Sequence, residues 1–335
     1  MRCSYLNVRD AAGTVKETLK VSKLCFGSLC IGPLQSDLAV ADGAEIIRCA
    51  LRLGVNFIDT AQLYETYPYI ARAAFPDTVI STKTYAYTKK LAEDALNEAL
   101  RELGRDAIDI FMLHEQESVH TIYGHIEALE YLFEQKRAGK IKAVGISTHH
   151  VAGVAGALEF NRTYKGGDKL DVIHPMLNVD GLGIIPERAG EHKTRQMEQA
   201  LADAKENGFF IFTMKPLGGG NLFASADRAL RYCLDKPYVD SVAVGMKSEL
   251  EVAANAHFFE TGRFTDEYYR SYIEREGKKK RLHIDGWCEG CGKCAEACPA
   301  GALGISGGRA VCDGGKCVLC GYCARACGCF AVKII

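Results

Sequence analysis

The sequence predicts a closed (β/α)₈ barrel of the TIM type, followed by a small α+β domain that is rich in cysteine. Between Val21 and about Phe259, short apolar runs alternate with amphipathic stretches, which is typical of strand–helix units around a parallel sheet. Eight such units in about 240 residues match the usual size of this barrel. The chain from Cys288 onward carries eight cysteines in two similar runs, which indicates a separate structure.

The predicted strands are short apolar runs that precede polar or glycine-containing segments. They are Lys23–Ser28, Asn56–Thr60, Thr78–Thr82, Ile108–Leu113, Ala143–Ser147, Val172–Ile173, Phe209–Thr213 and Ser241–Val244. Two of the predicted helices between them are Lys89–Leu103 and His125–Ala138, and the second ends at Gly139. An open doubly wound sheet is the alternative. The first half of the chain has no Gly-x-Gly-x-x-Gly between a strand and a helix, which counts against it.

The bulk properties exclude several classes of partner. The chain has 335 residues, 48% of them hydrophobic, which is enough for one large and one small domain. A net charge of −1 provides no field that would attract nucleic acid or an anionic membrane. Met1–Asp10 contains no apolar signal segment, and there is no run of about 18 apolar residues. The scattered cysteines outside the two runs are expected to stay as free thiols, which is typical of a reducing cytoplasm. We therefore expect a cytoplasmic protein without nucleic-acid or membrane partners.

A polar and basic segment, Phe264–Leu282, separates the two predicted domains. It contains Lys278-Lys279-Lys280-Arg281, which we interpret as a solvated linker, with a docking patch for an anionic partner as the alternative. We therefore assign residues 1–282 to the barrel with its linker and residues 283–335 to the cysteine-rich domain. The charges of the second domain nearly cancel, which favours a fixed appendage over a soluble carrier.

The cysteines of the second domain have a regular spacing. The two runs are Cys288-x-x-Cys291-x-x-Cys294-x-x-x-Cys298 and Cys317-x-x-Cys320-x-x-Cys323-x-x-x-Cys327. This is the ligand spacing of the bacterial ferredoxins that carry two [4Fe–4S] clusters, where the fourth cysteine of each run ligates the other cluster. We therefore predict that Cys327 completes the set of the first run and Cys298 that of the second. Cys312 and Cys329 are spare.

Two other uses of these cysteines are weaker. Zinc ribbons need two Cys-x-x-Cys pairs, and not three closely spaced ligands followed by a fourth. A disulfide framework needs an oxidising compartment, which nothing in the sequence indicates. The ferredoxin-like iron–sulfur interpretation is therefore preferred.

Four polar residues fall at or just after the carboxyl ends of predicted strands, where barrels of this type place their chemistry. They are Asp59, Tyr64, Lys83 and His114. Each alone has an ordinary structural explanation, such as a helix cap, a solvated amine or a buried imidazole. Together, in Gly54-Val-Asn-Phe-Ile-Asp-Thr-Ala-Gln-Leu-Tyr64 and the two following strand ends, the set resembles the Asp-Tyr-Lys-His tetrad of the aldo-keto reductases. The resemblance covers roughly residues 20 to 257.

The resemblance implies that each of these four residues has a separate role in carbonyl reduction. A phenol with a pKa of about 10 is a weak acid at neutral pH, and a nearby ammonium lowers that pKa. Tyr64 would donate a proton to the substrate carbonyl as hydride arrives, and Lys83 would tune its acidity. Asp59 would hold Lys83, and His114 would orient the carbonyl oxygen.

The resemblance also implies an NAD(P)H molecule extended across the barrel, with its phosphates near the last two strand–helix loops. The residues expected to contact it are Ser147, His174, Lys215, Gly218, Gly219, Gly220, Gly245, Lys247, Glu251 and Asn255. The glycine run would let backbone N–H groups approach a phosphate, although a plain turn has the same composition. Lys247 or Ser248 would meet a 2′-phosphate and Glu251 would repel it, so the choice between NADP and NAD stays open.

The sequence departs from the family's pattern around the nicotinamide. Ser147, Thr148 and His174 stand where many relatives have Ser, Asn and Gln, and Met214 stands where many have a stacking tyrosine. FMN, held by Lys215 and the glycines, is therefore an alternative cofactor.

Three functions are compatible with these motifs. The preferred hypothesis is an oxidoreductase that interconverts a carbonyl and an alcohol with NAD(P)H and transfers electrons through two [4Fe–4S] clusters, with a small-molecule substrate and a redox partner protein. The second is an ordinary reductase with structural clusters. The third is a ferredoxin-like electron-transfer protein whose barrel binds a flavin or a partner. Hydride carries two electrons and a cluster carries one, which is why a flavin enters these alternatives.

Overall fold

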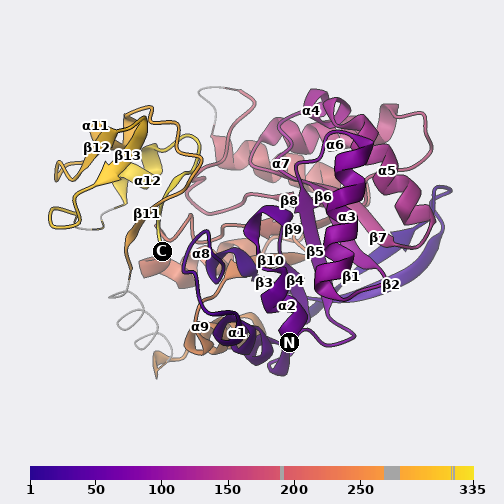
Figure 1. Cartoon of the computed structure of the whole chain (residues 1–335), viewed down its shortest axis with the longest axis horizontal. Helices are drawn as coiled ribbons and strands as arrows, with labels where there is room; N and C mark the ends of the chain where they lie inside the picture. Colours follow the sequence, from indigo (N-terminus) through magenta and orange to yellow (C-terminus); the bar gives the residue numbers. More distant parts are fainter. Residues whose placement is uncertain (189–191, 268–279, 318, 320) are drawn as a thin grey trace.

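The barrel predicted from the sequence is present. The structure is a computed structural model, which describes residues 1–188, 192–267, 280–317, 319 and 321–335. Eight parallel strands close in the order β10-β3-β4-β5-β6-β7-β8-β9 (Figure 1). They are β3 (Leu24–Gly27), β4 (Phe57–Asp59), β5 (Val79–Thr84), β6 (Ile108–Leu113), β7 (Ile141–Thr148), β8 (Val172–Pro175), β9 (Phe210–Met214) and β10 (Ser241–Gly245). Each of the eight predicted runs overlaps one of these strands, so this part of the prediction is confirmed.

Helices surround the barrel and connect its strands (Figure 1). They are α1 (Val40–Arg52), α2 (Tyr67–Ala73), α3 (Lys89–Leu103), α4 (Val119–Gly124), α5 (Ile126–Arg137), α6 (Val151–Thr163), α7 (Lys193–Glu206), α8 (Ala226–Leu234) and α9 (Glu249–Thr261). In α3 the Thr88 side chain caps the first turn and Gly104, with a φ of 63°, ends the helix. No helix of the described ranges is long and apolar enough to cross a membrane.

An N-terminal hairpin closes one end of the barrel. Its strands are β1 (Cys3–Arg9) and β2 (Val15–Ser22), which the sequence analysis did not predict. Leu6, Val8, Leu19 and Val21 are buried in one cluster with barrel side chains such as Phe57. Because β3 follows β2 almost directly, the hairpin lies at the amino ends of the strands. The opposite end, where the carboxyl ends of the strands meet, is left for a site.

The C-terminal module is a small α+β body beside the barrel, drawn in yellow in Figure 1. Its elements are β11 (Leu282–Ile284), α11 (Lys293–Glu296), β12 (Leu303–Ser306), β13 (Arg309–Cys312), α12 (Tyr322–Ala326) and β14 (Val332–Ile334). β11 pairs with β14 and β12 with β13, both antiparallel. Of the predicted basic linker, Lys278 and Lys279 lie outside the described residues. Arg281 donates a hydrogen bond to the Gln35 carbonyl of the barrel at 2.9 Å.

The module is docked on the open end of the barrel through its last strand. The Ile334 N–H donates to the Gly219 carbonyl at 3.0 Å, and Arg325 pairs with Asp180 at 2.8 Å. Phe330, 3% exposed, belongs to the main hydrophobic core of the barrel. A Cβ on Gly220 would lie 1.7 Å from the Ile334 carbonyl oxygen, so this approach is open to glycine alone.

Because of this close contact, we expect Gly220→Ala to detach the C-terminal strand β14 from the barrel. Gly208 is a matched control, because its φ of 86° is close to the 88° of Gly220 but its added Cβ would meet nothing within 4 Å. Both variants carry the backbone strain of a left-handed alanine, about 1–2 kcal/mol. Only Gly220→Ala should speed hydrogen exchange at the Ile334 amide, by roughly tenfold for each 1.4 kcal/mol of docking free energy lost. Equal protection of this amide in the two variants would contradict the assignment.

Candidate active site

The four residues predicted to act together converge at the open end of the barrel. Asp59 is the last residue of β4, Lys83 lies near the end of β5, and His114 directly follows β6. Tyr64 ends the short 3₁₀ helix Gln62–Tyr64 in the loop after β4. Because neighbouring parallel strands end side by side, residues far apart in the sequence meet at this edge.

A buried ion pair forms the floor of the site. Lys83 is 0% exposed, and its Nζ lies 2.7 and 2.9 Å from the two Asp59 carboxylate oxygens and 2.6 Å from the Thr60 carbonyl oxygen. Burial alone would raise the pKa of Asp59. The charge of Lys83, followed by His174, outweighs burial and lowers the pKa of Asp59 to about 2. Asp59 therefore stays ionised at neutral pH.

Tyr64 lies above this pair, but its acidity differs from the expectation. The Lys83 Nζ is 5.0 Å from the centre of the Tyr64 ring, and among the described residues its hydrogen bonds go to Asp59 and Thr60 instead of the phenol. Burial and the negative charge of Asp59 raise the pKa of Tyr64 well above its usual value. The net shift of the Tyr64 pKa is therefore opposite to the lowering that was predicted from Lys83.

His114 is held as a neutral imidazole beside Tyr64. Burial, and then the charge of Lys83, lower the pKa of His114 well below its usual value. Its ring stacks on Tyr85 with centroids 4.4 Å apart and meets the Tyr64 ring edge-on at 5.7 Å. Its Nδ1 has no hydrogen-bond partner among the described residues.

Tyr64 and His114 line a cavity of about 710 Å³ whose wall contains residues of both domains. This volume lies within the range of about 300–1,000 Å³ that is usual for small-molecule sites. On the barrel side the wall includes Lys215 and His149, and the module contributes Trp287, Cys329 and Phe330 among others. Of these five, Lys215 was expected to contact the cofactor, whereas His149, Trp287, Cys329 and Phe330 were not predicted to belong to the site. Only spatial proximity between distant segments connects them with the tetrad.

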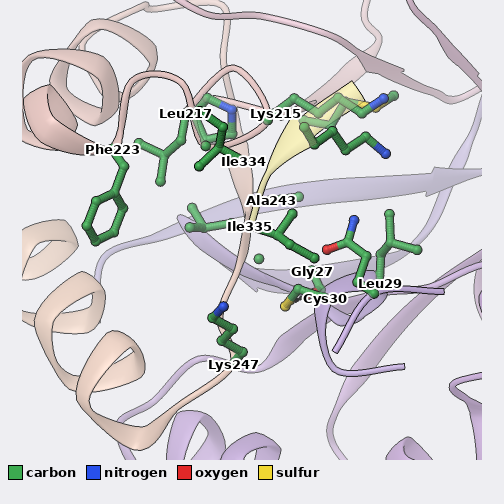
Figure 2. A pocket seen from close by; sticks show the side chains of 18 of the residues that line it. Gly27, Leu29, Cys30, Lys215, Leu217, Phe223, Ala243, Lys247, Ile334 and Ile335 are labelled. Carbon is green, nitrogen blue, oxygen red and sulfur yellow. Dashed lines mark hydrogen bonds between the residues drawn. The ribbon is translucent and has the colours of Figure 1, made fainter. Parts of the chain in front are cut away.

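A second, narrower space of about 180 Å³ runs from the tetrad along the barrel mouth. Asp59, Tyr64 and His174 line one part of it, and Gly245, Lys247 and Glu251 line another. This is the direction expected for an extended dinucleotide. Figure 2 shows Ile334 and Ile335 within the same groove, between Leu217 and Lys247, so the C-terminal strand roofs it.

The glycine run after β9 has another role than the one expected. A Cβ on Gly219 would meet the Phe330 ring at 2.9 Å, and one on Gly220 would meet Ile334. A Cβ on Gly218 would meet Leu182, a residue of the barrel's own loops, at 2.7 Å. The interpretation of these glycines as an open phosphate cradle is therefore corrected, because the C-terminal segment occupies the space in front of Gly219 and Gly220.

The other expected cofactor residues divide between the groove and the interior. The His174 Nδ1 lies 2.6 Å from the Phe212 carbonyl oxygen, and its Nε2 lies 3.5 Å from Asp59. Ser147 is fully buried and accepts a hydrogen bond from the Glu115 N–H, so its hydroxyl holds a loop. Asn255 is also fully buried, and its amide donates to the Glu251 carbonyl within α9. Neither Ser147 nor Asn255 lines the groove.

Three of the four thiols predicted for one cluster surround a small cavity in the module. Cys298, Cys317 and Cys323 line it together. Cys320, the fourth member of this set, lies outside the described residues. The Ala302 N–H donates to the Cys298 sulfur at 3.3 Å, and such backbone hydrogen bonds lower the pKa of Cys298. A thiol held this way is prepared to bind iron as thiolate.

The thiols of the other predicted set also gather. Cys294 and Cys327 are buried in one apolar cluster against which Cys288 packs, whereas Cys291 is exposed. Backbone N–H groups donate to the Cys288 and Cys327 sulfurs at 3.4 and 3.2 Å. Within the described ranges no three side chains are arranged to hold a single metal ion. Cluster thiolates each ligate a different iron atom, so they need no such arrangement.

Family models agree with this architecture. The model of the aldo/keto reductase family matches residues 23–228, which is more than half of the chain. The chain belongs to the aldo/keto reductase family. A model of 4Fe-4S binding domains matches residues 283–304, within the C-terminal module. The family prediction and the presence of a 4Fe–4S binding domain are thereby confirmed.

Individual relatives of this aldo/keto reductase family chain are distant. It is 24% identical over 212 residues to the aldehyde reductase YPR1 of Saccharomyces cerevisiae, covering 54% of this chain and 62% of that protein. It is 22% identical over 288 residues to the uncharacterized oxidoreductase YqkF of Bacillus subtilis, covering 75% and 93%. The chain spans slightly less than two thirds of the length of the first curated relatives that it matches.

The fold is shared with solved structures of the family. The holo form of the aldo-keto reductase AKR11C1 from Bacillus halodurans superposes with a TM-score of 0.61 at 22% sequence identity, covering 82% of this chain and 96% of that one. At this identity the likeness concerns the fold alone.

The ion pair predicts that Asp59→Ala strongly destabilises the barrel. It would leave the Lys83 ammonium buried without a carboxylate, which costs about 3–5 kcal/mol of unfolding free energy. The double variant Asp59→Ala/Lys83→Met removes the stranded charge and should recover most of this loss. Denaturant unfolding followed by circular dichroism measures both. If the double variant were as unstable as the single one, cavity formation and not the unpaired charge would dominate.

Proposed function

We propose that the chain is an oxidoreductase that interconverts a carbonyl and an alcohol in the cavity above Tyr64, with NAD(P)H as hydride donor. The observation that carries this proposal is the geometry of the tetrad: a charged Asp59–Lys83 pair beneath a protonated Tyr64, with neutral His114 beside it. The aldehyde reductase name of the yeast relative supports carbonyl chemistry.

The residues of this site suit proton transfer to a carbonyl oxygen. The raised pKa of Tyr64 keeps its proton in place at neutral pH until negative charge develops on the substrate. Lys83 then stabilises the phenolate, while Asp59 holds Lys83 in position. His114, as a neutral imidazole, orients the carbonyl oxygen. Bound NAD(P)H supplies the hydride.

The groove favours a dinucleotide over FMN. Its far end includes Lys247 and Glu251, near the start of α9, which a mononucleotide placed at Lys215 would not use. The C-terminal strand lies over the middle of the groove. The width available to a cofactor therefore depends on how closely this strand packs on the barrel. We propose NAD(P)H for this reason.

We further propose that the module binds two [4Fe–4S] clusters. One set comprises Cys288, Cys291, Cys294 and Cys327, and the other comprises Cys317, Cys320, Cys323 and Cys298. The gathering of Cys298, Cys317 and Cys323 around one cavity supports the crossed assignment of the fourth ligand. Bound clusters supply one-electron transfer, and a redox partner protein is then the expected partner of the module.

A structural role of the module is the second candidate. Trp287, Cys329 and Phe330 form part of the cavity wall, so the module shapes the substrate site whatever the redox state of its clusters. This role is compatible with the first and explains why the module is docked.

The tetrad predicts that Tyr64→Phe lowers kcat/KM for aldehyde reduction by about 10²–10⁴-fold, because the general acid is lost. NAD(P)H oxidation with 4-formylbenzamide, followed anaerobically, measures this. Tyr164→Phe is the control, since Tyr164 directly follows α6 and its hydroxyl donates to Glu130 of α5 at 3.2 Å. Undiminished turnover by Tyr64→Phe would refute the proposed role of the tetrad.

The cysteine assignment predicts about eight iron and eight sulfide atoms per chain after anaerobic purification. Cys329→Ser should keep all eight irons, because Cys329 is spare even though its sulfur lies 3.7 Å from that of Cys327. Cys298→Ser should lower the iron content or change the electron paramagnetic resonance spectrum of one cluster. Four irons in the unmodified protein would exclude the second cluster.

A further inference from the structure

A second polar group lies in the cavity, apart from the tetrad. The Lys215 Nζ and the His149 Nε2 are 2.8 Å apart, and both residues line the same cavity as Tyr64 and His114. Lys215 follows β9 with a φ of 58°, a conformation uncommon for residues other than glycine. The Phe330 ring lies 4.3 Å from its Nζ. Such a backbone outlier, fixed by the surrounding structure, is typical of functional positions.

Lys215 differs from Lys333, the other lysine that lines the cavity, because Lys333 has a carboxylate partner in Asp285. Among the described residues Lys215 forms no ion pair with a carboxylate. Burial, followed by repulsion from Lys333, lowers the pKa of Lys215 to about 7. Burial and then Lys215 itself lower the pKa of His149 well below its usual value, so the imidazole is a neutral acceptor. An anion beside Lys215 would relieve the desolvation of its ammonium.

The acids and bases that face Lys215 are already engaged with other groups. Glu115 accepts the Tyr85 hydroxyl at 2.7 Å and lies 3.7 Å from His149. Asp285 pairs with Lys333 at 2.5 Å and lies 3.1 Å from His283, Asp59 pairs with Lys83 at 2.7 Å, and Glu117 lies 3.9 Å from His150. His114 is neutral. Because His149 is neutral, Glu115 and, on the module side, Glu289 add negative charge to the cavity wall. The Lys215 ammonium therefore fits a singly charged anion better than a phosphate dianion.

We propose that Lys215, with His149 behind it, binds the carboxylate of the substrate, so that the enzyme acts on oxoacids or hydroxyacids. This inference rests on the proposed function, because it places the carbonyl of the same molecule at Tyr64. A substrate with a carboxylate at one end and a carbonyl at the other spans the two polar walls of the cavity. His149 is a positioning residue that accepts a hydrogen bond from the Lys215 ammonium.

Two pairs of nearly isosteric compounds test the subsite. Benzoate and benzamide measure binding without reaction by anaerobic calorimetry, and 4-carboxybenzaldehyde and 4-formylbenzamide measure turnover. The unmodified holoprotein should bind benzoate at least tenfold more tightly than benzamide and show a similar preference in kcat/KM. Lys215→Met should remove both preferences. Benzoate affinity should fall between pH 6 and pH 8, as Lys215 loses its proton near pH 7, while benzamide affinity stays constant.

Lys247→Met is the comparison variant, because Lys247 lines the dinucleotide groove but not the cavity. It should change the KM for NAD(P)H and leave the acid-to-amide ratio intact. If Lys215→Met instead raised the KM for NAD(P)H and kept that ratio, Lys215 would be a cofactor ligand and the subsite would be refuted. Absence of benzoate binding in the millimolar range would refute it as well. Benzoate preference without aldehyde turnover would leave the subsite standing and overturn the proposed reaction.

Discussion

The closure of the substrate cavity depends on one close backbone contact, between Gly219-Gly220 after β9 and Ile334 in the last strand. The Gly219 carbonyl accepts the Ile334 N–H, and no side chain fits at Gly220. Because β14 is held there, Phe330 enters the barrel core and Trp287 reaches the cavity wall. The two domains thus share a single site, and neither would enclose the cavity alone.

Burial shifts the pKa values of Asp59, Tyr64 and Lys215, but the direction of each net shift also depends on the charged groups beside the residue. Asp59 and Lys83 are both buried, and their mutual attraction lowers the pKa of Asp59 in spite of desolvation. Lys215 has no carboxylate partner among the described residues, so desolvation dominates and lowers its pKa to about 7. Burial and then the negative charge of Asp59 raise the pKa of Tyr64. The site therefore combines a fixed charge, a retained proton and an unmatched cation.

The barrel and the tetrad could be predicted because local patterns determine them. Strand–helix alternation gave the eight strands, and position at a strand end gave Asp59, Lys83 and His114. The glycine run was misinterpreted because its partner, Ile334, lies far away in the sequence and carries no motif. Lys215 and His149, 66 residues apart, meet only through the closure of the barrel. The N-terminal hairpin was missed because only four of its residues, such as Leu6 and Val21, face the core.

The predicted cluster site and the substrate cavity are connected mechanically through a very short segment. Cys327, a predicted ligand, is followed by Gly328, Cys329 and Phe330, which all line the cavity. The Cys327 sulfur accepts the Ala331 N–H, and Phe330 is anchored in the barrel core. The wall of the cavity therefore contains the three residues that follow a predicted cluster ligand directly in the chain, and both ends of this segment are anchored.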